Sequence, residues 1–235
     1  MTTSGTTAFD LNLNELVQEA FERCGSELRT GNDFRTARRS LNLLTIQWAN
    51  RGINLWTLDE ATIAMVADTA TYNLPLDTIG IMDIVIRTGS GVTQSDLTIS
   101  RISSTTYSSI PNKNSTGRPV QAWVDRQSGA TESGGITYPQ ITMWPIPDQS
   151  SKYTLVYFRL RRIQDAGDGV TTQDIPFRFL PALVSGLAFH LSGKISGAEM
   201  KRPLLKEEYE EDFLMASQED RERATLRLAP RIYST

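Results

Sequence analysis

The sequence predicts an α+β protein with an antiparallel helical bundle from the N- and C-terminal segments, an inserted antiparallel β-sandwich or barrel, and an extended C-terminal tail. Residues 9–52 and 177–224 repeat apolar side chains at the spacing of amphipathic helices. Residues 53–176 are rich in Thr, Ser, Ile, Val and Tyr and contain many turn signals, and the helical pattern stops before the tail, residues 225–235. The end helices would bury their stripes against one another, so the β-rich domain is expected to project from them. This geometry suits a connecting protein better than a catalyst.

Composition and charge predict a folded protein that does not grip nucleic acid. With 235 residues, 39% of them hydrophobic and 22% charged, the chain is long enough for one large domain or two modest ones. Residues 1–52 hold six basic and six acidic side chains and residues 177–235 hold nine of each, so the middle carries the whole net charge of −3. No segment has the excess of Lys and Arg with which proteins hold DNA phosphates, although DNA could pass nearby without being held.

The sequence has few features of a cofactor site or of a membrane-spanning segment. Cys24 is the only cysteine, which excludes an intramolecular disulfide and a thiolate zinc site, and its place on an apolar stripe predicts a buried, inert thiol. Residues 1–8 lack a signal-peptide pattern, and the apolar stretch Phe179–Leu191 is too short to span a bilayer. We therefore expect no cofactor, no membrane association and synthesis in a reducing cytoplasm.

Two helices are expected at the N-terminal end. Asn12 and Glu15 have the spacing of a capping box, and Gly25 is placed to end the first helix. Asn32 or Asp33 is expected to cap the second helix. Because the link between them is short, the two helices are predicted to be antiparallel neighbours.

The middle segment predicts short strands separated by turns. One of them puts Met82, Ile84 and Ile86 on its buried face, and Gly89–Gly91 marks the hairpin tip that follows it. The polar stretch Ser103–Pro119 is expected to include one short turn of helix. The predicted strands are Leu55–Leu58, Ala61–Met65, Ile79–Arg87, Leu97–Ile102, Val120–Arg126, Gln140–Trp144 and Tyr153–Arg162. Strands of this number and spacing favour a sandwich or a small barrel.

Two further helices follow the β-rich segment. The third contains Leu180–Leu191, and its wide apolar stripe, which includes Leu187, predicts a central and nearly buried helix. The fourth begins near Pro203 and is expected to run to Glu222. Its acidic side chains are expected mostly on the outer face: Glu207, Glu208, Glu210, Glu211 and Asp212.

Two features allow an enzymatic interpretation. His190 is the only histidine, but it lies on the most apolar helix without a nucleophile-elbow pattern, so a structural role is favoured over a Ser/His/Asp triad. Glu207 and Glu211 are four residues apart, a spacing that permits the paired carboxylates of a glycoside hydrolase. A convex helix face offers no apolar pocket to raise the pKa of one carboxyl group, so a solvated surface is favoured. A magnesium site in the acidic cluster Glu207–Asp212 is equally disfavoured, because runs of carboxylates are common on long surface helices. A cell-wall glycosidase is the leading alternative function.

Tryptophans and arginines allow binding functions. Trp56, Trp123 and Trp144 are candidate platforms of a carbohydrate-binding β module, although burial in a core is the commoner fate of tryptophan at strand spacing. The arginines that could form ion pairs between subunits or touch DNA are Arg35, Arg38 and Arg39 on the second helix and Arg159, Arg161 and Arg162 at a strand end. Ordinary solvated arginines are the simpler interpretation. The complete set of inter-subunit candidates is Arg35, Arg38, Arg39, Glu207 and Glu211.

The C-terminal tail combines basic and apolar residues. Arginines outnumber acidic residues from Arg221 onward, and four apolar side chains alternate with polar ones: Leu226, Leu228, Ile232 and Tyr233. A terminal stretch of this kind without a local partner is typical of a segment that becomes ordered on binding. A merely frayed end is the alternative.

Short sequence segments along nearly the whole chain form a recognisable pattern. The N-terminal segments are Phe9-Asp10-Leu11, Glu15-Leu16, Ala20-Phe21, Arg35-Thr36-Ala37-Arg38-Arg39-Ser40-Leu41 and Trp48-Ala49-Asn50-Arg51-Gly52. The middle segments are Tyr72-Asn73-Leu74-Pro75, Gly117-Arg118-Pro119, Val124-Asp125-Arg126 and Trp144-Pro145-Ile146-Pro147-Asp148. The C-terminal segments are Gly186-Leu187-Ala188, Leu205–Tyr209 and Asp220-Arg221-Glu222-Arg223-Ala224. Together these segments resemble those of head-to-tail connector proteins of short-tailed bacteriophages, the adaptors of the tail tubular protein A type.

The resemblance implies a structural virion protein rather than an enzyme. It implies a dodecameric ring of the chain itself beneath the portal protein, around a channel through which genomic DNA passes without sequence-specific binding. The β domain would face the next tail component, a tail nozzle or tail tube protein, and the C-terminal segment would dock on the portal. The implied portal-binding residues are Leu226, Arg227, Leu228, Pro230, Arg231, Ile232 and Tyr233.

Overall fold

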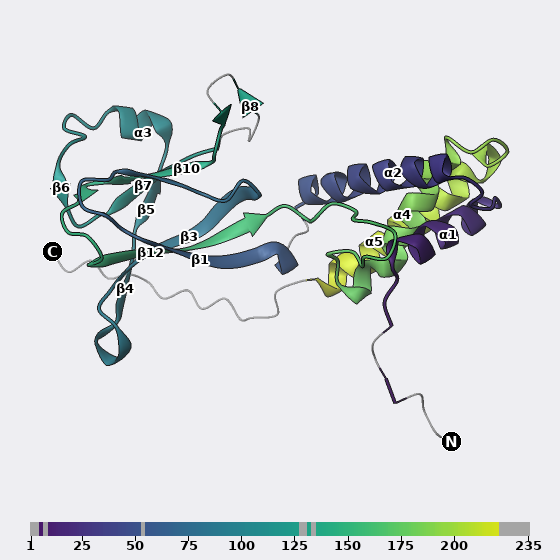
Figure 1. Cartoon of the computed structure of the whole chain (residues 1–235), viewed down its shortest axis with the longest axis horizontal. Coiled ribbons are helices and arrows are strands. Elements are labelled where there is room, and N and C mark those ends of the chain that lie inside the picture. The colour runs from purple at the N-terminus through teal and green to yellow at the C-terminus, as the bar shows by residue number, and fades with distance from the viewer. Residues whose placement is uncertain (1–4, 7–8, 53–54, 127–130, 133–134, 221–235) are drawn as a thin grey trace. The chain divides into compact units, whose positions relative to one another are not determined.

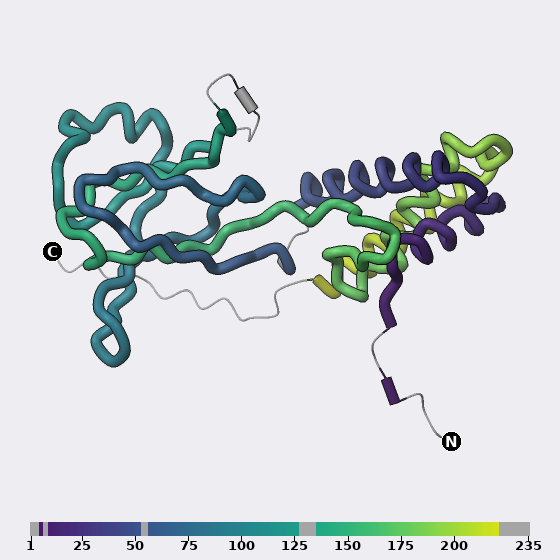
Figure 2. Tube along the Cα trace, viewed as in Figure 1, coloured from purple at the N-terminus to yellow at the C-terminus, as the bar shows by residue number. Residues whose placement is uncertain are grey.

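A computed structural model describes residues 5–6, 9–52, 55–126, 131–132 and 135–220. The chain divides into two compact units, which we call the helical unit (residues 1–55 and 164–235) and the β unit (residues 56–163). Figure 1 shows helices α1, α2, α4 and α5 grouped in the first and the sheet strands in the second, and Figure 2 follows the chain from α2 through the β unit to α4. The protein is therefore mixed α+β, as predicted.

Helix α1 (Leu13–Cys24) begins and ends at the predicted residues. The side chain of Asn12 accepts a hydrogen bond from the backbone N–H of Glu15 at 3.0 Å, and the Glu15 carboxylate accepts one from the N–H of Asn12 at 3.1 Å. Gly25 ends the helix in the left-handed conformation, with φ of 79°. The thiol of Cys24 is buried, as predicted, because it lies on the inner face of this helix.

Helix α2 (Gly31–Asn50) begins two or three residues earlier than predicted. Thr30, rather than Asn32 or Asp33, is the N-cap, because its hydroxyl accepts a hydrogen bond from the N–H of Asp33 at 3.2 Å. Asp33 completes the capping box by accepting the N–H of Thr30 at 3.0 Å. Two capping groups in the right positions outweigh the low helix propensity of Gly31 between them.

Helix α4 (Leu180–Ser192) is the buried centre of the helical unit, as predicted. Its residues from Ala182 to Ala188 are all buried, and it contacts α1, α2 and α5. Gly186 allows a close approach, since a Cβ atom there would lie 2.9 Å from side-chain atoms of Leu44 and Tyr209. The Nε1–H of buried Trp48 donates to the hydroxyl of Tyr209 at 2.9 Å, which pairs two polar groups inside this core.

Helix α5 (Arg202–Glu219) is shorter than the predicted helix that ends at Glu222. Asp220 leaves the helical region, with ψ of 43°, and its buried carboxylate pairs with Arg178. This ion pair favours a helix end at Glu219 over another turn. Glu222 lies outside the described residues.

Two four-stranded sheets share the core of the β unit. The first sheet has the order β1 (Leu58–Ala64), β12 (Tyr153–Arg161), β3 (Thr78–Thr88) and β4 (Ser95–Thr98), and all of its pairs are antiparallel. The second has the order β2 (Thr71–Asn73), β10 (Gln140–Trp144), β7 (Gln121–Asp125) and β5 (Ser100–Ile102). Residues from both sheets, Ile84, Ile86 and Ile141 among them, form one hydrophobic cluster.

The remaining elements of the β unit are short. They are β6 (Thr116–Gly117), β8 (Thr131–Glu132), β9 (Gly135–Ile136), β11 (Ile146–Pro147) and the helix α3 (Ser104–Ser108), which is the predicted turn of helix in the polar stretch. The β5–β7 and β6–β11 pairs are parallel, which the prediction of purely antiparallel sheets missed. Over the residues that the structure describes, the sheets stay open and form no closed barrel.

Three strand predictions need correction. Leu55–Leu58 is not a strand, because a 3-10 turn at Leu55–Thr57 leads into the single strand β1. Leu97–Ile102 is two strands, since buried Ile99 carries the chain from one sheet to the other. Met82 is exposed rather than buried, because an irregularity in the β3–β12 register gives its inward place to Ile81.

Leu187→Asp should prevent folding of the helical unit. Leu187 is fully buried on α4, and an unpaired carboxylate there would cost several kcal/mol. Circular dichroism and thermal melting are the measurements. Glu207→Gln is the control, because Glu207 is exposed and the change should alter the free energy of unfolding by less than about 0.5 kcal/mol. A Leu187→Asp protein that melts like the control would show that α4 is not the buried centre.

Candidate docking surfaces

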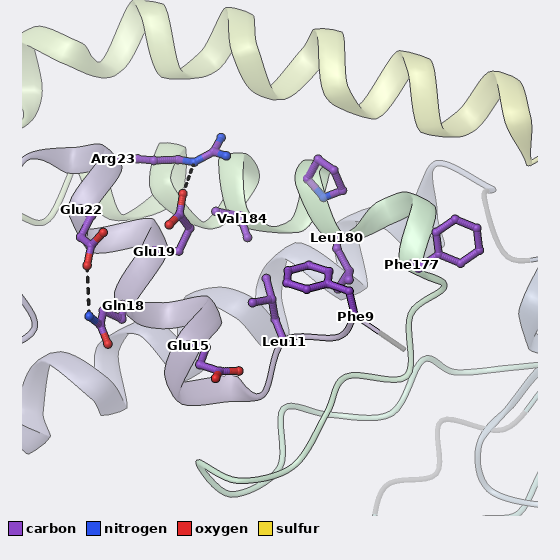
Figure 3. Close-up of a pocket in the computed structure, with 11 residues that line it drawn as sticks. Phe9, Leu11, Glu15, Gln18, Glu19, Glu22, Arg23, Phe177, Leu180 and Val184 are labelled. Carbon is purple, nitrogen blue, oxygen red and sulfur yellow. Dashed lines mark hydrogen bonds and ion pairs between the residues drawn. The ribbon is translucent and has the colours of Figure 1, made fainter. Parts of the chain in front are cut away.

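A groove of about 660 Å³ lies in the helical unit and is lined by residues from α1, α4 and the segments that precede them. Its lining residues are Phe9, Leu11, Glu15, Gln18, Glu19, Glu22, Arg23, Phe177, Leu180, Pro181 and Val184. Figure 3 shows that Phe9, Leu11 and Leu180 gather in one part of the groove, with Phe177 farther along. The residues Phe9 and Phe177 are 75% and 77% exposed, which is unusual for such large apolar residues.

The α1 side of the groove is acidic, and most of its charges already have a partner. The Nε of Arg23 donates to Glu19 at 3.2 Å, and Arg23 also pairs with Glu208 of α5. Gln18 donates to Glu22 at 3.1 Å (Figure 3). An apolar groove with an acidic wall suits a peptide that carries apolar and basic side chains.

The sequence analysis missed this groove because its aromatic residues lie far apart along the chain. Phe9 and Phe177 come together only when α1 packs against α4. The available signal was local. Phe9 lies before α1, and Phe177 opens the short 3-10 helix Phe177–Phe179 that leads into α4, so each large apolar residue stands just before a predicted helix.

Of the predicted arginines on α2, two are exposed and one is held within the unit. Arg35 and Arg39 are exposed. Arg38 is half-buried, and its Nε donates to the backbone carbonyl of Ala166 at 2.8 Å. Arg35 and Arg39 are thus the two that a neighbouring molecule can reach.

Arg159 is not the solvated arginine that the sequence favoured. It is only 9% exposed and donates to Asp77 at 2.6 Å and to Asp59 at 3.0 Å, so it links β12 to β1 and to the segment before β3. Burial acts to lower the pKa of Arg159, but its hydrogen bonds and ion pairs with these two carboxylates raise that pKa overall.

The four glutamates between Glu207 and Glu211 on α5 divide into two groups. Glu208 pairs with Arg23, and Glu210 pairs with Arg51 at 3.1 Å. These two ion pairs connect α5 to α1 and to the end of α2. Glu207 and Glu211 are exposed and do not line the groove described above. This setting lacks the enclosed, partly apolar surroundings that glycoside hydrolysis needs. Within the described part of the chain, no cluster of His, Cys, Asp or Glu could hold a metal ion.

His190 has the surroundings of a structural residue. It is half-buried on α4, and burial, followed by the positive charges of Lys194 and Arg202, lowers its pKa from the ordinary 6.5. These neighbours are cations, whereas a triad histidine needs a carboxylate.

The candidate carbohydrate platforms are half-buried in the β unit. Trp123 stacks on Tyr107 with ring centroids 5.2 Å apart, and the Nε1–H of Trp144 donates to the carbonyl of Asn112 at 3.0 Å. Trp56 is also half-buried. One ring face of Trp123 is therefore already covered.

The seven predicted portal-binding residues, Leu226, Arg227, Leu228, Pro230, Arg231, Ile232 and Tyr233, lie outside the described residues. No helix in the described ranges is both long and apolar enough to cross a membrane.

A family comparison spans both units, since residues 11–231 match the SU10 adaptor protein family. The chain belongs to this family. The match confirms the resemblance to bacteriophage head–tail adaptors and indicates a structural adaptor that is a component of a virion. A family of structural adaptors suggests a non-enzymatic role. No curated protein matches the chain significantly.

The lowered pKa of His190 predicts a pH-dependent stability. His190 binds a proton less readily in the folded protein than in the unfolded chain. The stability that the neutral imidazole contributes is therefore fully present above pH 6.5 and is lost as the pH falls through the lower pKa of the folded state. Urea unfolding should show a lower midpoint at pH 5 than at pH 7.5, and His190→Gln should reduce this decline. An equal decline in both proteins would contradict the assignment.

Proposed function

We propose that this adaptor forms a dodecameric ring that joins the portal to the tail around the DNA channel. The observation that carries the proposal is the family match over residues 11–231, which includes both compact units. Exposed apolar side chains on α2 and α5 support it, because Leu43, Ile46, Leu214 and Met215 have no role in the core of a single copy.

The charge of the chain supports a passive relation to DNA. A net charge of −3 gives little attraction to phosphates, so genomic DNA would pass through the ring without being held and without sequence-specific binding. Weak attraction to phosphates suits a channel through which the genome has to pass quickly.

We assign the portal contact to the tail, residues 225–235, and the contact with the tail nozzle or tail tube protein to the β unit. The tail contains Leu226, Leu228, Ile232 and Tyr233 for apolar grooves and Arg227 and Arg231 for carboxylates. Pro230 restricts the conformations of the free tail, which reduces the entropy lost on docking.

The isolated protein should be mainly monomeric and form rings only on its portal. The N-terminal and C-terminal segments each carry balanced charges, so no strong electrostatic self-association is expected. Light scattering of the protein alone, and electron microscopy after mixing with the portal protein of the same phage, are the measurements. A stable dodecamer in the absence of portal would contradict this prediction.

Removal of residues 225–235 should abolish ring formation on the portal and leave the melting temperature nearly unchanged. The described helical core ends at Asp220 and is built from contacts that α4 makes with α1, α2 and α5. Arg227→Ala with Arg231→Ala in the full-length chain is the matched variant for the charged contacts. If the truncated protein assembles normally, the portal contact lies on the helical unit, and the groove between α1 and α4 is the surface to change next.

A further inference from the structure

Two exposed helix faces of the helical unit have complementary chemistry. The α2 face consists of Arg35, Arg39, Leu43 and Ile46, which share one side of the helix at positions i, i+4, i+8 and i+11. The α5 face consists of Glu207, Glu211, Leu214 and Met215, at i, i+4, i+7 and i+8. The apolar members are between 47% and 57% exposed.

Both faces point away from the core that holds the unit together. On α2 the buried side carries Leu41, Leu44 and Trp48, and on α5 it carries Tyr209 and Phe213. None of the four charged residues of the two faces belongs to the ion pairs that fasten the helices, such as Arg51 with Glu210. Among the described residues, neither the core packing nor the ion pairs of one copy use these side chains.

We propose that the α2 face of one protomer packs against the α5 face of the next protomer, and that this contact forms the ring. The spacing allows one common register. The two arginines on α2 are one helical turn apart, and so are the two glutamates on α5. When the two helices lie parallel, Arg35 therefore meets Glu207 and Arg39 meets Glu211. Leu43 then meets the apolar end of the α5 face, which begins at Leu214.

The same charges oppose contacts between identical faces. An α2–α2 contact would bring arginines together, and an α5–α5 contact would bring glutamates together, so either is penalised by like-charge repulsion. The favoured contact joins two different faces, which makes it heterologous. Heterologous contacts continue from copy to copy and close into a ring when the rotation between copies allows it.

This inference rests on the proposed ring, and it explains why the ring would need a template. Exposed ion pairs and a few apolar side chains give a weak contact between two free copies. Binding to neighbouring sites on a portal raises the effective concentration of adjacent copies and makes the same weak contact sufficient.

Charge reversal tests the contact on the portal. The first variant carries Arg35→Glu and Arg39→Glu, the second carries Glu207→Arg and Glu211→Arg, and a third carries all four changes. Each of the first two should assemble at least about tenfold more weakly than the unchanged protein, which corresponds to ~1.4 kcal/mol. The third variant, and an equal mixture of the first two, should recover assembly, because opposite charges then face each other at every contact. Arg29→Glu, one charge reversal outside both faces, is the control, because Arg29 and its partner Glu27 are both highly exposed.

Recovery in the mixture separates a surface effect from misfolding, since two misfolded proteins would not rescue each other. If the first two variants form normal rings, the α2–α5 contact is wrong while the adaptor function stands. If neither the four-change variant nor the mixture recovers assembly, the pairing is also wrong.

A second experiment needs no portal and therefore tests the contact even if the proposed function fails. Protomers with Leu43→Cys are mixed with protomers with Met215→Cys at high concentration and oxidised. Cys24 is buried and should not take part. We expect cross-linking in the mixture and little in either protein alone, and a chain with both changes should give a ladder beyond the dimer. Equal cross-linking in each protein alone, or a ladder that stops at the dimer, would overturn the head-to-tail contact.

Discussion

The burial of α4 is the constraint on which the helical unit depends. Ten of its residues are buried, including Ser185 and Ser192, so the helix has almost no side that water can solvate. It must be covered by other helices, and the structure supplies α1 and α2 from before the β unit and α5 from after it. Because α4 cannot be covered by α5 alone, the N-terminal and C-terminal segments have to pack together. The β unit is then a long insertion between elements that need each other.

Close packing around α4 also decides which polar groups lie inside and which face outward. Gly186 brings α4 within contact of Leu44 and Tyr209, and the hydrogen bond between Trp48 and Tyr209 satisfies the polar atoms left in that layer. Adjacent glutamates on α5 consequently have different roles. Glu208 and Glu210 pair with arginines of the helical unit, whereas Glu207 and Glu211 stay exposed. A difference of one residue turns a side chain by about 100° around the helix, which is enough to exchange one role for the other.

Local signals were sufficient where neighbouring residues decide the structure. The capping box at Asn12 and Glu15 and the strand Gln140–Trp144 follow directly from such signals. The errors occur where distant residues decide. Ile99 carries the chain between sheets because both sheets share a core, and Arg159 is buried because Asp59 and Asp77, which are distant in sequence, approach it in the folded unit. The groove beside Phe9 and Phe177 was missed for the same reason, since it is made by the packing of α1 on α4.

A connector that assembles only at its proper place benefits from lateral contacts that are weak by themselves. Association of two free proteins loses translational and rotational freedom that costs roughly 4–15 kcal/mol, and exposed ion pairs of about 0.2–1 kcal/mol each do not offset it. A template changes this balance, because copies bound side by side have already lost that freedom. In the proposed ring, weak faces such as those of α2 and α5 would add to one another, while the same faces would hold two free copies together only weakly. A strongly apolar face would bind tightly to many surfaces, including incorrect ones. Charged residues mixed with half-exposed apolar residues make a weaker and more selective face. Such a face suits an adaptor whose partner has to determine where it assembles.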